Sequence, residues 1–270
     1  MAVAASAWGG VETMIRRIEL IGLPVTVFPT LDDCLAHVLP LIGPGEPGVF
    51  ASFINPRSYY LAQHDPAYGA ALARLDLVLP DGIGIVWALR QLTGVRAARI
   101  SFDATSLYHP VFRHLQSLRC PVFIIGGRPG VAAKAAERMQ TIYPTLNVVG
   151  VMHGYQSRAH SVRTIKNSGA RFVLCGMGAP NQEAMLMALK QAGFSGSAFS
   201  CGGFLDQVVE KKEYYPRWVD RLEVRCLYRL AREPRRLCRR YLYEYQAFVR
   251  QFLQTMLTRP PRSARTDESP

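Results

Sequence analysis

The stretch "LDLVLPDGIGIVWALR", residues 75–90, joins a mainly apolar run to a helix-like segment through one short polar turn. The run ends at Pro80, the carboxylate of Asp81 follows at once, and Gly82 and Gly84 open the next segment. Short apolar runs bounded by turn residues are typical of strands that are buried on both faces. We therefore expect a strand, a glycine turn that carries Asp81, and a helix.

The same pattern repeats along most of the chain. Further strand-like runs are "GVFASFIN" (48–55), "CPVFIIGG" (120–127), "LNVVGVMHG" (146–154), "RFVLCGMG" (171–178) and "GSAFSCGG" (196–203). Helical segments between them cover 59–75, 84–92, 131–143, 157–169 and 181–193. Continuous apolar strands that alternate with helices indicate a mainly parallel sheet covered on both faces. We predict an open, Rossmann-like α/β fold.

The chain changes character after Asp206. Residues 211–250 hold twelve Lys or Arg and five Asp or Glu, which gives a net charge of +7 out of +12 for the whole chain. Arginines recur every three or four positions from Arg217 to Arg239, the spacing of one helical face. We predict an N-terminal extension at 1–23, the Rossmann-like core at 24–210, a basic helical appendage at 211–258 and a disordered tail at 259–270.

Composition restricts the class of protein. No run of about eighteen apolar residues is present, so a membrane-spanning helix is not expected. The six cysteines form no CxxC pair, which favours buried reduced thiols in a cytosolic protein. The basic appendage indicates an anionic partner: a phosphorylated substrate, nucleic acid or a membrane surface. A basic helical face that is merely solvated is the plainer alternative.

Polar residues and glycines follow every predicted strand. In a parallel sheet the carboxyl ends of the strands meet at one edge, and ligands bind there in open α/β folds. We call this edge the rim. It would carry Asn55, Asp81, Gly126–Gly127, His153, Gly178–Gln182 and Gly202–Asp206. The convergence predicts a ligand site on the rim.

The local patterns leave alternatives open. Asp81 suits either a helix N-cap or a general base that takes a proton from an acceptor hydroxyl. The turn "GGRPG" (126–130) suits either a tight strand-to-helix connection or a phosphate cradle built from backbone amides. In "GMGAPNQE" (176–183), Asn181 would cap a helix and Glu183 would favour its dipole, or Gln182 would hold a base or sugar.

The ordered set of motifs "FIN", "PDGIGIVWALR", "IIGGRPGVAAKAAERM", "GMGAPNQE", "GGFLD" and "EVRCLYRLAREPRRLCRRYL" resembles the WecG/TagA/CpsF glycosyltransferases over about residues 48–242. The resemblance implies an inverting, metal-independent transfer of a hexose or N-acetylhexosamine from a UDP-sugar to a polyprenyl-diphosphate-linked saccharide. Such an enzyme would serve bacterial cell-surface polysaccharide synthesis. It would be peripheral on the cytoplasmic membrane face, with an anionic membrane surface and no nucleic acid as partner. Oligomeric state stays open.

The resemblance also assigns roles to single residues. Asp81 resembles the catalytic base, Asn55 a residue that places the sugars, Gln182 an active-site glutamine, and Arg99 a residue that meets the diphosphate. Arg229, Arg236 and Arg239 match appendage arginines that approach the membrane and complete the site. Arg99, the amides at Gly126 and Gly127 and the appendage arginines would stabilise the leaving diphosphate in place of a metal, because no DxD motif is present. Gly178, Asp103 and Asp206 are further substrate-binding candidates, the last two on the acceptor and nucleotide sides.

The chain departs from the family's pattern where sugars would bind. Phe53 stands where a Thr is usual, and Phe102 stands where a Gly is usual. Two other classes compete with this interpretation. A Rossmann-type nucleotide-binding protein would need GxGxxG after its first strand, which is missing. A nucleic-acid-binding module could use residues 211–250 but would leave the polar rim unexplained.

Overall fold

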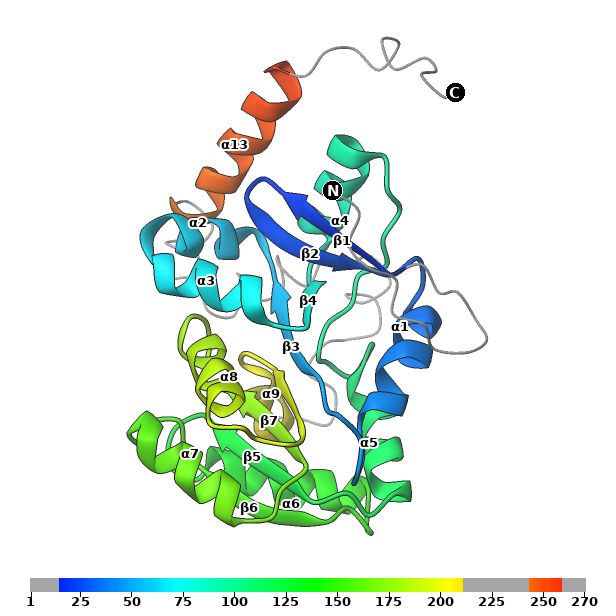
Figure 1. The fold of residues 1–270 in the computed structure, drawn as a ribbon, viewed down its shortest axis with the longest axis vertical. Helices are drawn as coiled ribbons and strands as arrows, with labels where there is room; N and C mark the ends of the chain where they lie inside the picture. Colours follow the sequence, from blue (N-terminus) through cyan, green and yellow to red (C-terminus); the bar gives the residue numbers. More distant parts are fainter. Residues whose placement is uncertain (1–14, 211–242, 259–270) are drawn as a thin grey trace.

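The computed structural model describes residues 15–210 and 243–258. Its centre is a six-stranded, entirely parallel sheet in the order β4-β3-β8-β7-β5-β6 (Figure 1). The strands are β3 (Phe50–Ile54), β4 (Leu77–Pro80), β5 (Val122–Gly126), β6 (Val148–Met152), β7 (Phe172–Gly176) and β8 (Ser197–Ser200). Each lies within one of the apolar runs, so the predicted Rossmann-like α/β fold is confirmed.

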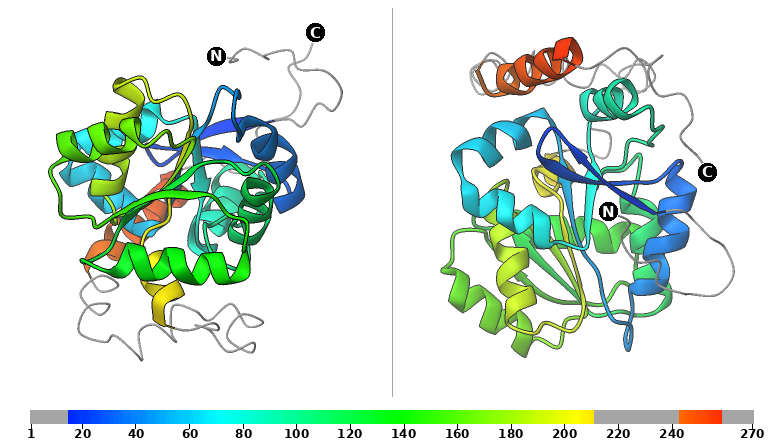
Figure 2. Two further views of the ribbon diagram at one scale, coloured as in Figure 1. Left: turned by 90° about the horizontal axis from the view of Figure 1, so that it is seen from below. Right: turned by 45° about the horizontal axis from the view of Figure 1, so that its top comes forward.

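Helices cover both faces of the sheet and form one apolar cluster on each side (Figure 2). One face carries α1 (Leu31–Val38), α5 (Tyr108–Ser117), α6 (Val131–Ile142) and α9 (Phe204–Glu210). The other carries α2 (Pro56–His64), α3 (Pro66–Arg74), α4 (Ile83–Thr93), α7 (Arg158–Asn167) and α8 (Asn181–Gln191). Because β3, β4, β5, β7 and β8 are buried between these layers, their sequences read as continuous apolar runs, whereas β6 is the partly exposed edge strand.

The predicted helix over 59–75 is wrong as a single element. It divides at Asp65, whose side chain accepts hydrogen bonds from the backbone N–H groups of Ala67 and Tyr68 and so caps α3. Pro66 occupies the first turn of α3, where a missing N–H costs nothing. The cap and the proline therefore end α2 and begin α3 at one point.

A hairpin, a short 3-10 helix and the helices α1, α5 and α9 lie outside the predicted alternation. A hairpin of β1 (Arg16–Leu20) and β2 (Leu23–Val27) crosses the boundary expected at residue 23. It packs beside β4, where the Thr26 hydroxyl accepts a hydrogen bond from the Val78 N–H at 3.1 Å. A short 3-10 helix, η1 (Leu39–Leu41), follows α1. The hairpin therefore covers an otherwise open edge of the sheet.

The last described helix, α13 (Tyr245–Thr258), packs on α2 and α4 (Figures 1 and 2). Phe248 lies against Tyr59 with ring centroids 6.3 Å apart, and Phe252 lies against Trp87 at 4.8 Å. Residues 211–242, most of the predicted basic appendage, lie outside the described residues. No helix in the two described ranges is long and apolar enough to cross a membrane.

Candidate active site

The register of two neighbouring strands brings Asn55 and Asp81 together. Ile54 of β3 pairs with Pro80 of β4, so the next residue of each strand lies at the same point of the rim. The Asp81 N–H continues the pairing by donating to the Ile54 carbonyl at 2.8 Å. Asn55 caps α2 through its side-chain oxygen, which accepts the Arg57 N–H at 3.0 Å. Two residues far apart in the sequence therefore sit side by side.

The helix cap after β4 is Gly82, not Asp81. Gly82 has a φ of 109°, which favours glycine, and no side-chain hydrogen bond caps the start of α4. A Cβ on Gly82 would meet no atom within 4 Å, so the position where a side chain would stand is open space. The Asp81 side chain is 38% exposed. The N-cap interpretation of Asp81 is thus wrong, and the carboxylate faces a region that a ligand can reach.

Arg99 lies between two carboxylates. Its guanidinium is 3.3 Å from Asp81 Oδ1 and 3.5 Å from Asp103 Oδ2. The backbone holds it there because the Ile100 N–H donates to the Pro80 carbonyl at 3.0 Å, which fastens this connection to the end of β4. The arrangement places one cation within reach of two acidic side chains at the rim.

Hydroxyl groups that sequence reasoning missed complete this cluster. Arg99 donates to the Ser101 and Thr105 hydroxyls, each at 3.0 Å. Those hydroxyls donate in turn to the Asp103 carboxylate, each at 2.7 Å. The Thr105 N–H also donates to Asp103 at 2.9 Å, which makes a local turn. An Asp followed two residues later by Thr is the signal that could have predicted it.

The glycines after β5 have a packing explanation. A Cβ on Gly126 would lie 2.3 Å from the Gly176 carbonyl oxygen, and one on Gly127 would lie 2.5 Å from Val131. The Gly127 N–H already donates to Gly176 at 3.1 Å. The tight-connection interpretation of "GGRPG" therefore accounts for both glycines, and the amide of Gly127 is already used within the protein.

Gly178 differs from these two. Its φ is 73°, and a Cβ there would meet no atom within 4 Å. The helix α8 begins three residues later with Pro180 as its N-cap residue, so the expectation that Asn181 caps it is wrong. The β7–α8 turn thus leaves space at the rim beside Gly178.

Gln182 and Glu183 lie beneath the rim rather than on it. Gln182 is 5% exposed, and its side-chain oxygen accepts the Gly202 N–H at 3.0 Å. Its side-chain nitrogen donates to Glu183 at 2.9 Å. Glu183 is fully buried and also accepts the Ser52 hydroxyl at 2.7 Å. Glu183 does lie in the first turn of α8, as expected, and its carboxyl group also belongs to a buried network.

A family model supplies the decisive comparison. The model for the glycosyl transferase WecG/TagA/CpsF family matches residues 18–262. The chain belongs to the WecG/TagA/CpsF glycosyltransferase family. A relative from Shigella boydii, named UDP-Gal:alpha-D-GlcNAc-diphosphoundecaprenol beta-1,4-galactosyltransferase, is 24% identical over 209 residues, which cover 76% of this chain and 86% of the relative.

The structure gathers some predicted site residues of this WecG/TagA/CpsF family member and leaves others apart. Asn55, Asp81, Arg99 and Asp103 form one cluster, and Gln182 bonds to the β8–α9 turn. Asp206 is exposed in the first turn of α9, which follows that turn. Arg229, Arg236 and Arg239 lie outside the described residues. The functional roles of all of them stay predictions.

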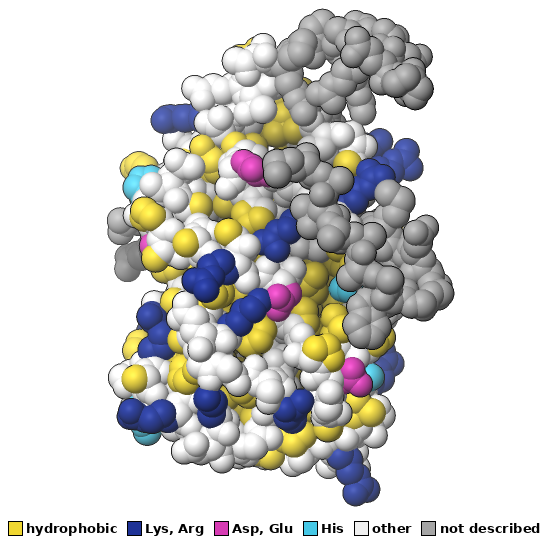
Figure 3. All heavy atoms as spheres, viewed as in Figure 1, with side chains coloured by type: hydrophobic (Ala, Val, Ile, Leu, Met, Phe, Trp, Pro, Cys, Tyr) yellow, Lys and Arg dark blue, Asp and Glu magenta, His cyan; other side chains and the backbone are white. Residues whose placement is uncertain are grey.

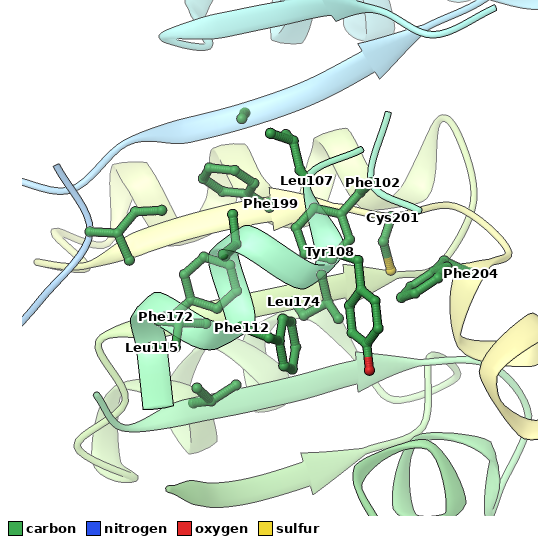
Figure 4. Packing of buried hydrophobic residues seen from close by; sticks show 14 of the residues in the cluster. Phe102, Leu107, Tyr108, Phe112, Leu115, Phe172, Leu174, Phe199, Cys201 and Phe204 are labelled. Atoms are coloured by element: carbon green, nitrogen blue, oxygen red, sulfur yellow. The ribbon is translucent and has the colours of Figure 1, made fainter. Parts of the chain in front are cut away.

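The two departures from the family pattern prove to be neighbours. Phe53 and Phe102 meet edge to face with ring centroids 6.3 Å apart. Phe102 also contacts Phe112, Phe199 and Phe204 at 5.9–6.3 Å, in the cluster shown in Figure 4. Both phenylalanines are buried. They pack as one unit under the rim.

The C-terminal helix is fastened next to this site. Arg57, two residues after Asn55, pairs with Glu244 at 2.5 Å and donates to the Ala179 carbonyl at 3.2 Å.

Elsewhere on the described surface, Lys and Arg side chains are spread out rather than gathered in one patch on the face that Figure 3 shows. Within the described ranges, no group of three His, Cys, Asp or Glu residues is placed to hold a metal ion.

Proposed function

We propose that this protein is an inverting hexosyltransferase that moves a sugar from a UDP-sugar to a polyprenyl-diphosphate-linked saccharide. The observation that carries the proposal is the Asp81–Arg99 pair at the rim of a WecG/TagA/CpsF family member. The Shigella boydii relative supports both substrates, because its name gives a UDP-sugar donor and a diphosphoundecaprenol-linked acceptor. Family membership favours glycosyl transfer over the nucleotide- and nucleic-acid-binding alternatives.

Asp81 would act as the general base. Its carboxylate takes the proton of the acceptor hydroxyl, and that oxygen attacks the anomeric carbon on the face opposite UDP. The bond from the anomeric carbon to the phosphate oxygen breaks, and UDP leaves with the electron pair. Configuration at the anomeric carbon is thereby inverted. The 38% exposure of the Asp81 side chain is consistent with access by a hydroxyl.

Arg99 would serve the leaving group. The single contact of its Nη1 with Asp81 is 3.3 Å, longer than a good charge-assisted hydrogen bond. A diphosphate offers stronger paired acceptors, so Arg99 can turn towards it without leaving Asp103. That movement would remove the Arg99 contact from the Asp81 carboxylate, and so raise its basicity, when the donor binds. Donor binding and base activation would then be coupled through one side chain.

The remaining candidates would position the substrates. Asn55 lies beside Asp81 and would help to place the sugars, Gly178 would border a substrate, and Asp103 and Asp206 would contribute on the acceptor and nucleotide sides. Gln182 lies beneath the rim and would act through the turn that it holds. Arg229, Arg236 and Arg239 would approach the anionic lipid surface on the cytoplasmic face and complete the diphosphate site. Metal independence belongs to the proposal and stays a prediction.

The test is a donor screen followed by a transfer assay. Candidate UDP-sugars are ranked by thermal shift, and those that bind are offered with a synthetic polyprenyl-diphosphate N-acetylglucosamine acceptor. Mass spectrometry reports the added sugar, and nuclear magnetic resonance reports the anomeric configuration. The proposal predicts one added hexose or N-acetylhexosamine with inverted configuration. Retained configuration, or transfer only from donors without UDP, would contradict it.

A further inference from the structure

The side chain of Glu183 is fully buried, yet only half of its carboxyl group is used. Oε1 accepts two hydrogen bonds, from the Ser52 hydroxyl at 2.7 Å and from the Gln182 side-chain nitrogen at 2.9 Å. Oε2 has no hydrogen-bond partner among residues 15–210 and 243–258. A buried ionised carboxylate with one oxygen unpaired is costly. The proposed reaction gives this group no role, so its presence needs another explanation.

The contacts of Gln182 allow only one orientation of its side-chain amide. The Gly202 N–H can only donate, so the amide oxygen must face it, as the 3.0 Å contact shows. The amide nitrogen then faces Glu183 Oε1, which accepts. A reversed amide would set two donors against each other at Gly202 and two acceptors against each other at Glu183. The carboxyl group is therefore one of the two groups that fix Gln182.

The same network reaches three segments of the rim. Ser52 lies on β3, three residues before Asn55, and its hydroxyl is 2.9 Å from that of Ser200 on β8. Gln182 holds the β8–α9 turn through Gly202. Glu183 itself lies in the first turn of α8, just after the β7–α8 turn. One carboxyl group thus connects the ends of β3, β7 and β8 from below.

We propose that Glu183 is a positioning residue, which acts as a neutral acid through Oε1 to hold Gln182 and the rim turns in their working arrangement. The inference rests on the proposed function, because the working arrangement is the one that transfers sugar. Because Oε1 already accepts two hydrogen bonds, the acid proton sits on Oε2. Glu183 makes no contact with substrate in this account and is not a catalytic residue.

The surroundings of the carboxyl group favour the neutral form. Burial raises the pKa of Glu183, against lowering effects from its hydrogen bonds with Gln182, Ser52 and its own backbone and from the charge of Arg57. Burial and then the Glu183 carboxyl raise the pKa of both Tyr68 and Cys175, which places them close by. The groups around it are Ser52 (β3), Arg57 (α2), Tyr68 (α3), Cys175 (β7), Gln182 (α8) and Ser200 (β8). Only Arg57 carries a full charge.

The main test is a double-mutant cycle with Gln182. Glu183→Gln keeps an acceptor at Oε1 and should retain transfer to within about threefold of wild type. Glu183→Leu removes the acceptor and should lower kcat by about 10- to 100-fold, the scale expected when site groups are misplaced. In a Gln182→Met background, Glu183→Leu should add little further loss, because it acts through Gln182. Additive losses in the cycle would overturn the proposal.

A matched control separates positioning from general weakening. Thr26→Val removes another buried hydrogen bond, the one to the Val78 N–H, which lies on the hairpin side of β4 and involves no side chain of the Glu183 network. It should lower the melting temperature without lowering kcat. Suppose that Thr26→Val and Glu183→Leu lower the melting temperature by the same amount. If they then also lower kcat by the same factor, Glu183 only stabilises the fold and the proposal is wrong.

Two readouts do not depend on transfer, so they decide the inference even if the proposed function fails. In nuclear magnetic resonance spectra, the Gln182 side-chain amide signals should be sharp in wild type and Glu183→Gln but broadened in Glu183→Leu. Because the pKa of Glu183 is raised in the folded protein, this residue contributes its full stabilisation at pH values below the ordinary pKa of glutamate. That contribution is lost as the pH rises through the raised pKa. The melting temperature of wild type should therefore fall relative to Glu183→Gln as pH rises. A pH-independent difference, or unchanged amide signals in Glu183→Leu, would refute it.

Discussion

Apolar contacts should anchor α13 far more strongly than its ion pair does. Phe252 is 4% exposed and packs against Trp87 with the two rings tilted, whereas Arg57 and Glu244 keep 27% and 20% of their side chains exposed. Truncation of a buried Phe to Ala costs about 3–5 kcal/mol, while a partly exposed ion pair contributes about 0–1 kcal/mol. Phe252→Ala should therefore lower the free energy of unfolding several times more than Glu244→Gln. If α13 detaches from the rest of the protein in Phe252→Ala, the loss of free energy of unfolding cannot exceed the free energy with which α13 packs on α2 and α4.

Urea unfolding and hydrogen exchange measure the two parts of this prediction. Phe252→Ala should lower the unfolding midpoint and speed amide exchange throughout α13, but not in β3 or β7. Glu244→Gln should change both by little, and Val249→Ala, which alters an exposed position on the same helix, is the matched control. If Glu244→Gln destabilises as much as Phe252→Ala, the ion pair holds the helix and our estimate of its small contribution is wrong.

Three further predictions follow from the site and the sequence. Phe53→Ala and Phe102→Ala should each lower the free energy of unfolding in urea by about 3–5 kcal/mol. Because the rings pack on each other, the double variant should show a coupling energy of about 0.5–1.5 kcal/mol, and strict additivity would show that they do not act as one unit. Transfer should survive excess EDTA, since arginine side chains are expected to stabilise the diphosphate, and loss of activity with rescue by Mg²⁺ or Mn²⁺ would refute that expectation. Changing Arg229, Arg236 and Arg239 together to Glu should abolish binding to anionic liposomes and most transfer, and unchanged flotation would show that these arginines are only a solvated face.

Periodicity predicted the sheet because burial on both faces leaves a continuous apolar signal in each strand. The rim could be predicted for the same reason, since parallel strands bring their ends together. Asn55 and Asp81 lie side by side because of the register between β3 and β4. Neither motif by itself indicates that these two strands pair. The fold class, and the meeting of Asn55 and Asp81 at the rim, were therefore accessible from local patterns.

Long-range polar contacts could not be predicted in this way. Arg99 reaches Asp81 because an irregular connection runs along the end of β4, and such segments have no periodicity. Glu183 sits in the first turn of a helix, where a carboxylate usually favours the dipole, but its turn faces the interior. The helix break at Asp65 needed only the cap and the proline together, and that signal was present in the sequence.

The most direct test of the central claim is transfer by Asp81→Asn. Asparagine has the size of aspartate but cannot take a proton, so folding and UDP binding should stay close to wild type. Transfer to the lipid-linked acceptor should fall by about 10²-fold or more, the usual scale for the loss of a general base. An Asp81→Asn protein that binds UDP normally and retains most of its transfer activity would contradict the assignment of Asp81 as the base.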